Sequence, residues 1–456
     1  METGLGPFLV WGARLLGSAL VGILLLVVYR AIRRRSPRAG ALVAAGIVIR
    51  GVLASSLFFV SYLDLPLLRG IHSGDGFWSL AFDARLYFRW ATGAYGVEIG
   101  RGARSPAYVE ILSHWMQLVG VSPASGALLN LCCYLAIAWI IVRVLRRHEP
   151  VALAALAAFT FSPALLVFGT QSLKDIFFGL LLVVICTGAW ALLRERPGGL
   201  RQLGADLAIA LGVGAALQVA AGVRAYVPVF VALALTLALV SGALWPLRPG
   251  TWRRLGRCVL VLLLVNGFWL SGRAGQMAVA RAVRPPTVAV PGAAVEEEED
   301  VLGRFTGEFD RLRSGFTRTG GNTNLGGEVS ARGVSGRLAA LGYGLLLTFV
   351  PFSALVWAGV VPAVGRRVFI AIADVDTIFM DCSLAVLAVL LFRRTRGRDL
   401  NVLYALFAGL LALSLTVFLA YVVTNYGTLF RLRLMAAASF WMLALAVQRR
   451  TDEGHA

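Results

Sequence analysis

The chain contains 456 residues, of which 58% are hydrophobic and only 15% are charged. This composition excludes a soluble globular protein of this size and is typical of a polytopic membrane protein. The net charge of +19 comes from arginines that lie at the ends of apolar runs. Because these arginines form no continuous face, they argue against a nucleic-acid partner and favour contact with anionic lipid headgroups.

Apolar runs of about twenty residues recur along the chain, and each is long enough to cross a bilayer as a helix. They predict an all-α polytopic membrane protein with about eleven transmembrane helices. The expected spans are 7–29, 40–62, 124–145, 151–170, 173–193, 204–222, 226–246, 258–271, 377–392, 401–423 and 428–447. The basic cluster follows the first apolar run, the reverse of the order in a signal peptide, so we expect no cleavable signal.

Short breaks rich in arginine separate several spans, for example at 30–38, 143–147 and 393–398. The positive-inside rule places such breaks in the cytoplasm. With the N-terminus outside, the eleven spans put every arginine-rich break and the C-terminus in the cytoplasm. The other polar groups then lie on outer loops. We therefore expect an extracytoplasmic active site on a plasma membrane of the bacterial inner-membrane type.

This topology divides the chain into four segments. They are an extra N-terminal helix with its basic loop at 1–39, a transmembrane core at 40–271 that includes a first outer loop at 63–123, a large outer loop at 272–337, and a C-terminal transmembrane segment at 338–456. Between Ser105 and Gly120, apolar residues recur at helical spacing and predict an amphipathic helix in the membrane interface. The stretch 338–365 must enter and leave on the outer side, which predicts a re-entrant or interfacial segment broken at Pro351.

Ionisable residues at the edge of a membrane are costly and therefore indicate function. In the first outer loop, Asp83 lies among aromatic residues, where a carboxylate can act as general base toward a hydroxyl group. Asp83 could instead bind Mg²⁺ or Mn²⁺ with Asp75, or form a salt bridge to Arg85 or Arg89. The cysteines and histidines show no metal-ligand spacing. No cofactor is expected, and a divalent metal is the less favoured alternative.

Two cations are predicted at the outer ends of central helices. Lys174 is the only lysine of the chain and lies beside Asp175 at a helix start. The pair fits either a capping arrangement or a specific need for an ammonium group. Arg224 interrupts an apolar stretch at its outward turn. It either binds an anionic partner or extends to the lipid phosphates.

The last predicted span carries the strongest signal, because Arg431 and Arg433 lie near its outer end. Two guanidinium groups at that depth are costly unless they meet an anion, and they can bind phosphate oxygens in pairs. Together with Lys174 and Arg224, they are predicted to bind a lipid phosphate. Five neighbouring polar residues are expected to contact the donor or the acceptor: Asp75, Tyr87, Gln171, Asp175 and Asn425.

Cations at the outer face and a carboxylate on an outer loop fit an anionic, membrane-embedded substrate such as a polyprenyl-phosphate or polyprenyl-diphosphate sugar. Asp83 would deprotonate the acceptor hydroxyl that attacks the anomeric carbon. The four cations would stabilise the departing lipid phosphate, whose negative charge rises in the transition state. Such a one-step displacement would invert the anomeric centre.

Several elements follow one another in a characteristic order. They are the Phe82-Asp83-x-x-x-Tyr87 element with the amphipathic helix after it, the Ser-Leu-Lys-Asp turn at 172–175, the pair Pro351-Phe352 after the large outer loop, and the Asn-x-Gly-x-x-x-Arg-x-Arg pattern at 425–433. In these elements the chain resembles the GT-C superfamily of membrane glycosyltransferases, which use lipid-phosphate sugars. The resemblance implies a GT-C-like core at 40–271, a polyprenyl-phosphate donor and a catalytic role for Asp83.

The chain departs from that family in three respects. Its first outer loop lacks a tight Asp-x-Asp or Glu-x-Asp pair, and the helix at 7–29 is an addition. In contrast to oligosaccharyltransferases, no sizeable C-terminal soluble domain is expected. The expected partners are a lipid-linked sugar donor, membrane lipids and an acceptor of unspecified kind, in the building of cell-envelope polysaccharide. The alternatives are an O-antigen-type polysaccharide polymerase or ligase, a non-enzymatic flippase for lipid-linked sugars, and a structural subunit of an envelope-assembly complex.

Overall fold

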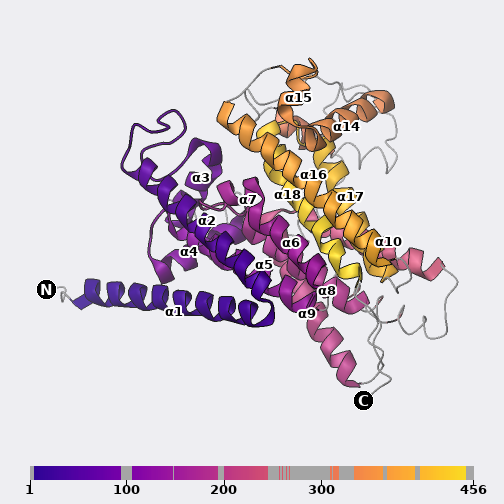
Figure 1. The fold of residues 1–456 in the computed structure, drawn as a ribbon, viewed down its shortest axis with the longest axis horizontal. Helices are drawn as coiled ribbons and strands as arrows, with labels where there is room; N and C mark the ends of the chain where they lie inside the picture. The colour runs from indigo at the N-terminus through magenta and orange to yellow at the C-terminus, as the bar shows by residue number, and fades with distance from the viewer. Residues whose placement is uncertain are drawn as a thin grey trace, which may run out of the picture.

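The computed structural model describes most of the chain as a bundle of helices (Figure 1). The described residues are 5–93, 105–146, 148–193, 200–244, 309–310, 312–317, 333–362, 367–395 and 401–447, with single positions at 256, 259, 263 and 267. Within these ranges, eight helices are long and apolar enough to cross a membrane. The chain is therefore an all-α polytopic membrane protein. Most of the predicted span 258–271 and most of the large outer loop lie outside the described residues.

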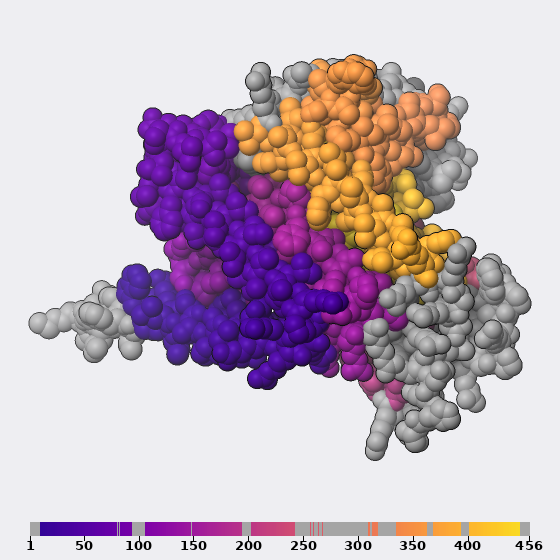
Figure 2. Space-filling model, viewed as in Figure 1, coloured from indigo at the N-terminus to yellow at the C-terminus, as the bar shows by residue number. Residues whose placement is uncertain are grey.

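Two long helices open the chain, α1 (Leu5–Arg35) and α2 (Pro37–Tyr62). Ser36 alone joins them, and its hydroxyl caps α2 by accepting a hydrogen bond from the Ala39 amide at 3.1 Å. In the most apolar part of each helix only 17% of the residues are buried, so most of their surface faces outward. Figure 1 shows α1 extending to one side of the bundle, and Figure 2 shows it along the lower edge of the molecule, where it packs against α2, α4 and α5.

After α2, the chain forms η1 (Ser79–Ala81), α3 (Phe82–Ala91) and α4 (Pro106–Val119). The predicted amphipathic helix is present as α4. It packs against α3, α5 and α9. The buried side of α4 consists of Tyr108, Val109, Leu112 and Met116.

The interior of the bundle is formed by helices from both halves of the chain. Their bounds are α5 (Ser125–Val144), α6 (Glu149–Phe161), α7 (Pro163–Phe168), α8 (Asp175–Leu193), α9 (Leu200–Val223), α10 (Val227–Leu244), α16 (Arg367–Thr395), α17 (Val402–Val422) and α18 (Tyr426–Met442), which continues as η3 (Leu443–Val447). Helix α8 packs against α5, α9 and α18, and α17 packs against α10 and α18.

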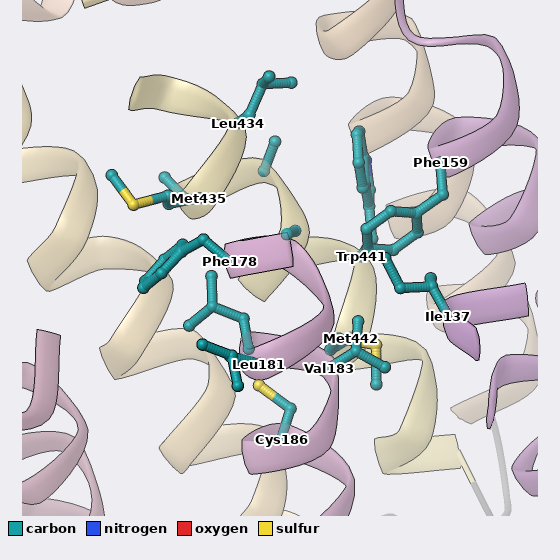
Figure 3. Packing of buried hydrophobic residues seen from close by; sticks show 14 of the residues in the cluster. Ile137, Phe159, Phe178, Leu181, Val183, Cys186, Leu434, Met435, Trp441 and Met442 are labelled. Atoms are coloured by element: carbon teal, nitrogen blue, oxygen red, sulfur yellow. The ribbon is translucent and has the colours of Figure 1, made fainter. Parts of the chain in front are cut away.

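Helix α18 is the most enclosed element of the bundle. In its apolar stretch, 83% of the residues are buried, compared with 17% in α1 and α2. Figure 3 shows Phe178 of α8 close to Met435 of α18, while Trp441 packs edge to face on Phe159 with ring centroids 4.8 Å apart. Because α18 is surrounded by protein, a charged residue on it must find its partner inside the bundle.

The predicted single span at 151–170 is wrong, because the helix breaks between α6 and α7. Pro163 has no amide hydrogen and cannot continue α6. The guanidinium of Arg50, in the middle of α2, donates to the carbonyls of Phe159 and Thr160, both at 2.9 Å. On the other side of the break, Asp376 of α16 accepts hydrogen bonds from the first turn of α7. Charged side chains therefore satisfy the backbone that the break leaves open.

The C-terminal part begins with α14 (Gly333–Phe349) and α15 (Phe352–Trp357), which are separated at Pro351 as predicted. Helix α16 starts at Arg367, ten residues before the expected span at 377–392. The additional turns carry acidic residues, which the hydropathy of the sequence excluded from the predicted span. In Figure 2, the end of α2 lies at the upper left of the view and α14 to α16 begin at the upper right.

Candidate functional site

Asp83 lies in the first turn of α3, where the helix dipole favours a negative charge. Its Oδ2 accepts a hydrogen bond from Nη2 of Arg431 at 2.8 Å, although the two residues are 348 positions apart. The structure therefore joins the predicted base of the first outer loop to a predicted phosphate ligand of the last helix.

Arg431 also forms an ion pair with a second carboxylate. Its Nε lies 3.2 Å from Oδ2 of Asp175, the first residue of α8. Oδ1 of Asp175 in turn accepts a hydrogen bond from Nη2 of Arg224 at 2.8 Å. Arg224 directly follows α9, so four different elements each supply one member of this row of alternating charges. We call Asp83, Arg431, Asp175 and Arg224 the charge chain.

Lys174 is buried next to the charge chain. Its Nζ donates to the hydroxyl of Ser105 and to the carbonyl of Val223, the latter at 3.4 Å, and lies 5.4 Å from the ring centre of Tyr87. Burial, and then the positive charge of Arg224, lowers the pKa of Lys174 well below its usual range. A bound anion would oppose this effect, because it favours the charged ammonium.

Side-chain exposure is greatest at one end of the charge chain. Along the chain the exposed fractions are 33% for Asp83, 14% for Arg431, 5% for Asp175 and 8% for Arg224. The charge chain is thus accessible at the Asp83 end and buried at Asp175 and Arg224. Burial, with the charge of Asp83 second, raises the pKa of the neighbouring Tyr87 to about 12. The Tyr87 hydroxyl therefore stays protonated at neutral pH and can donate a hydrogen bond.

Arg433 does not join the charge chain. Its side chain is 1% exposed, and its Nη2 lies 2.9 Å from Oδ2 of Asp376. Its Nη1 donates to Oγ1 of Thr377 at 2.6 Å and to the carbonyl of Thr348 at 3.2 Å. Because its guanidinium binds Asp376, Thr377 and Thr348 and no member of the charge chain, we leave Arg433 out of the phosphate site that the sequence predicted for it.

Three other residues with predicted contacts have different surroundings. Asp75 pairs with Arg85 of α3 at 2.6 Å. Asn425 caps α18, and its side-chain oxygen accepts a hydrogen bond from the Thr428 amide at 3.2 Å. Gln171 is buried in the turn before α8, and within the described structure its side-chain oxygen has no hydrogen-bond partner. Of these three, Gln171 keeps an acceptor that is unpaired among the described residues, four positions before Asp175 in the sequence.

No protein-family model, curated protein or solved structure matches the chain. The function must therefore be inferred from the site itself. With Lys174 protonated, the site holds three cations and two carboxylates, and thus one positive charge in excess. In the part of the chain that the structure describes, no group of three or more His, Cys, Asp or Glu side chains could hold a metal ion.

Two residues that the sequence reasoning missed support this arrangement. Ser105 binds Lys174 from the residue before α4, with a backbone φ of 63°, and no sequence signal links positions 69 apart. Asp376 had a signal, because a carboxylate inside a long apolar helix needs a buried partner. That requirement predicts an ion pair with a basic residue elsewhere in the bundle, although it does not select Arg433.

Proposed function

We propose that the chain is a membrane glycosyltransferase that moves a sugar from a polyprenyl-phosphate donor to an acceptor hydroxyl on the extracytoplasmic face. The observation that carries this proposal is the contact of Arg431 with both Asp83 and Asp175, beside Arg224 and Lys174. A carboxylate suited to act as base and cations suited to hold a phosphate share one end of the bundle.

The charge of the site supports an anionic donor with one negative charge. With Lys174 in its ammonium form, a sugar phosphodiester would neutralise the one positive charge by which the three cations exceed the two carboxylates. It would also favour the ammonium form of Lys174, whose pKa is lowered by burial and by Arg224. The greater exposure of Asp83 suits an acceptor that enters at that end, while the phosphate lies toward Lys174 and Arg224.

In the proposed step, the acceptor oxygen bonds to the anomeric carbon while the bond from that carbon to the phosphate oxygen breaks. The hydroxyl proton passes to Asp83. The polyprenyl phosphate leaves as a monoester with one more negative charge than the diester. Since Asp83 becomes neutral at the same time, Arg431 loses one anionic partner as another forms within its reach. Attack from the side opposite the leaving group inverts the anomeric centre.

The position of the site along the helices supports an extracytoplasmic location. Asp175 begins α8, Arg224 follows α9, and Arg431 lies in the second turn of α18. The opposite ends of α8 and α9 adjoin the arginine-rich break at 194–201. The positive-inside rule favours a cytoplasmic location for that break, and this supports an extracytoplasmic location for the charge chain.

The proposal is tested by transfer in proteoliposomes, with a panel of radiolabelled polyprenyl-phosphate hexoses and pentoses as donors and membrane glycolipid extract as acceptor. Asp83→Asn should lower the transfer rate by about 10²–10⁴-fold, the usual contribution of a general base. Asp75→Asn is the matched control, because it makes the same change in the same loop on a carboxylate that pairs with Arg85. It should keep most of the activity.

Transfer by Asp83→Asn at the wild-type rate would show that Asp83 is not the base. A wild-type protein that accepts only polyprenyl-diphosphate sugars would support the O-antigen-type polymerase or ligase instead. Movement of a lipid-linked sugar across the vesicle membrane without transfer would support the flippase.

A further inference from the structure

Arg431 and Arg433 hold α18 from two sides. They are two residues apart, so their side chains leave the helix about 200° apart. Arg431 extends to α3 and α8, whereas Arg433 extends to Asp376 on α16. Helix α18 packs against both α8 and α16. A shift or rotation of α18 that moves Arg433 must therefore move Arg431 as well.

Asp376 connects α16 to two other elements through its two carboxylate oxygens. Oδ2 binds Arg433 at 2.9 Å, as described above. Oδ1 accepts hydrogen bonds from the hydroxyl of Ser162 and from the amide of Ala164, both at 2.9 Å. These two donors lie at the start of α7. There, amides without a partner inside the helix and the positive end of the helix dipole favour a carboxylate. One buried carboxylate thus fixes both α18 and α7.

Helix α7 leads directly to the other partner of Arg431. Helix α7 ends at Phe168, and six residues join it to Asp175, the first residue of α8. The ring of Phe168 contacts the ring of Phe430, with centroids 5.7 Å apart. Phe430 is the residue immediately before Arg431 in the sequence. These contacts connect back to their starting point. Asp376 binds Arg433 on α18, Arg431 on α18 binds Asp175, and the chain before Asp175 leads back to α7, which binds Asp376.

We propose that Asp376 and Arg433 are positioning residues, which set the place of Arg431 relative to Asp175 from within the bundle. The inference rests on the proposed function for its consequence in catalysis, where a displacement of about 1 Å can cost 10²-fold in rate. The positioning itself is inferred only from the buried ion pair of Arg433 with Asp376 and from the hydrogen bonds of Asp376 to α7.

The single lysine of the chain supplies a probe of the charge chain that does not depend on activity. Selective labelling with ¹⁵N-lysine gives one side-chain signal, from Lys174, in protein held in lipid nanodiscs. Arg431 lowers the pKa of Lys174, whereas Asp175 and Asp83 raise it. If Arg431 withdraws from the two carboxylates, its positive charge moves away and the two negative charges are no longer neutralised. Each of these effects raises the pKa of Lys174. Arg431→Gln provides the reference for the direction of this shift.

The decisive variant is the double replacement Asp376→Asn with Arg433→Gln, which removes both charges and leaves neither one buried alone. Asp374→Asn is the matched control, because it neutralises a carboxylate two residues earlier on α16 that bonds to Ser353 instead. Thr377→Val is a milder second variant, since it removes one acceptor of Arg433 and no charge.

We expect the double variant to raise the pKa of Lys174 by about half a pH unit or more, and Asp374→Asn to leave it unchanged. In the transfer assay, kcat of the double variant should fall about 10–100-fold. If the double variant does not fold, a smaller rise in Thr377→Val decides the question. An unchanged Lys174 pKa in the folded variant would overturn the positioning role. Absence of transfer by the wild type would overturn only the proposed function.

Discussion

Replacement of Asp175 by Asn should destabilise the protein far more than replacement of Asp83 by Asn. Asp175 is shared by two buried guanidinium groups, those of Arg224 and Arg431. Without its charge, Arg224 loses its carboxylate partner and stays 8% exposed, with the face of Phe178 at 5.6 Å. In contrast, Arg431 keeps its pair with Asp175 when Asp83 is neutralised.

The magnitudes follow from burial. Removal of one partner of a buried ion pair typically costs about 3–5 kcal/mol, because the other charge remains without compensation. We expect a loss in this range for Asp175→Asn, whose side chain is 5% exposed. Asp83 is 33% exposed, and pairs of that kind contribute only about 0–1 kcal/mol. The two variants should thus differ by roughly 3 kcal/mol in free energy of unfolding.

Reversible unfolding in mixed micelles, with the mole fraction of sodium dodecyl sulfate as denaturant and circular dichroism as signal, measures this difference. The double variant Asp175→Asn with Arg224→Gln is the control. It removes the uncompensated charge and should be more stable than Asp175→Asn alone. Equal losses for Asp83→Asn and Asp175→Asn would refute the reasoning, because they would mean that burial does not decide the cost.

Three further predictions concern the buried polar groups and one close contact. Because burial lowers the pKa of Lys174 from its usual value near 10.5, the unfolded chain binds a proton that the folded chain has released. The free energy of unfolding should therefore rise with pH between the lowered pKa and about 10.4, and Lys174→Met should flatten this rise in the same micelle assay. Arg50→Gln should cost about 1–3 kcal/mol, since it leaves two carbonyls at the end of α6 without a donor, and its infrared spectrum should show a shifted amide band. Gly126→Ala places a Cβ 2.5 Å from Cα of Ser172 and displaces the turn before α8, which should lower the free energy of unfolding by about 1–3 kcal/mol. Gly179→Ala is the control and should unfold like the wild type, because the nearest atom to its new Cβ is 3.9 Å away.

Hydropathy predicted the helices well where they are apolar throughout and failed where polar residues enter them. The early start of α16 was missed because Asp374 and Asp376 lower the hydropathy of its first turns. In the fold these carboxylates have partners, which a hydropathy average cannot include. The break at Pro163 was missed for the opposite reason. Its flanks are apolar, and membrane helices tolerate proline when neighbours satisfy the freed backbone.

The structure brings part of the predicted site together, whereas Arg433, Asp75 and Asn425 have other partners. The sequence places Asp83, Asp175, Arg224 and Arg431 at helix ends on one side of the membrane, and the structure brings all four into contact. The sequence does not indicate which of Arg431 and Arg433 faces the site. That choice depends on the rotation of α18 about its axis, which is set by contacts such as those with residues 57 and 348 positions away in sequence.

Arg50 also has a consequence for the assembly of the protein in the membrane. It lies in the middle of α2, and the carbonyls that accept its hydrogen bonds are 109 and 110 positions further along the chain. At 5–20 residues per second, roughly 5–20 s separate the synthesis of Arg50 from that of its acceptors. During that interval α2 carries an arginine at a cost of about 2.5–3.5 kcal/mol for insertion at the helix centre. The apolar remainder of α2 must outweigh this cost until α6 is synthesised, after which the carbonyls of Phe159 and Thr160 can bind the guanidinium of Arg50.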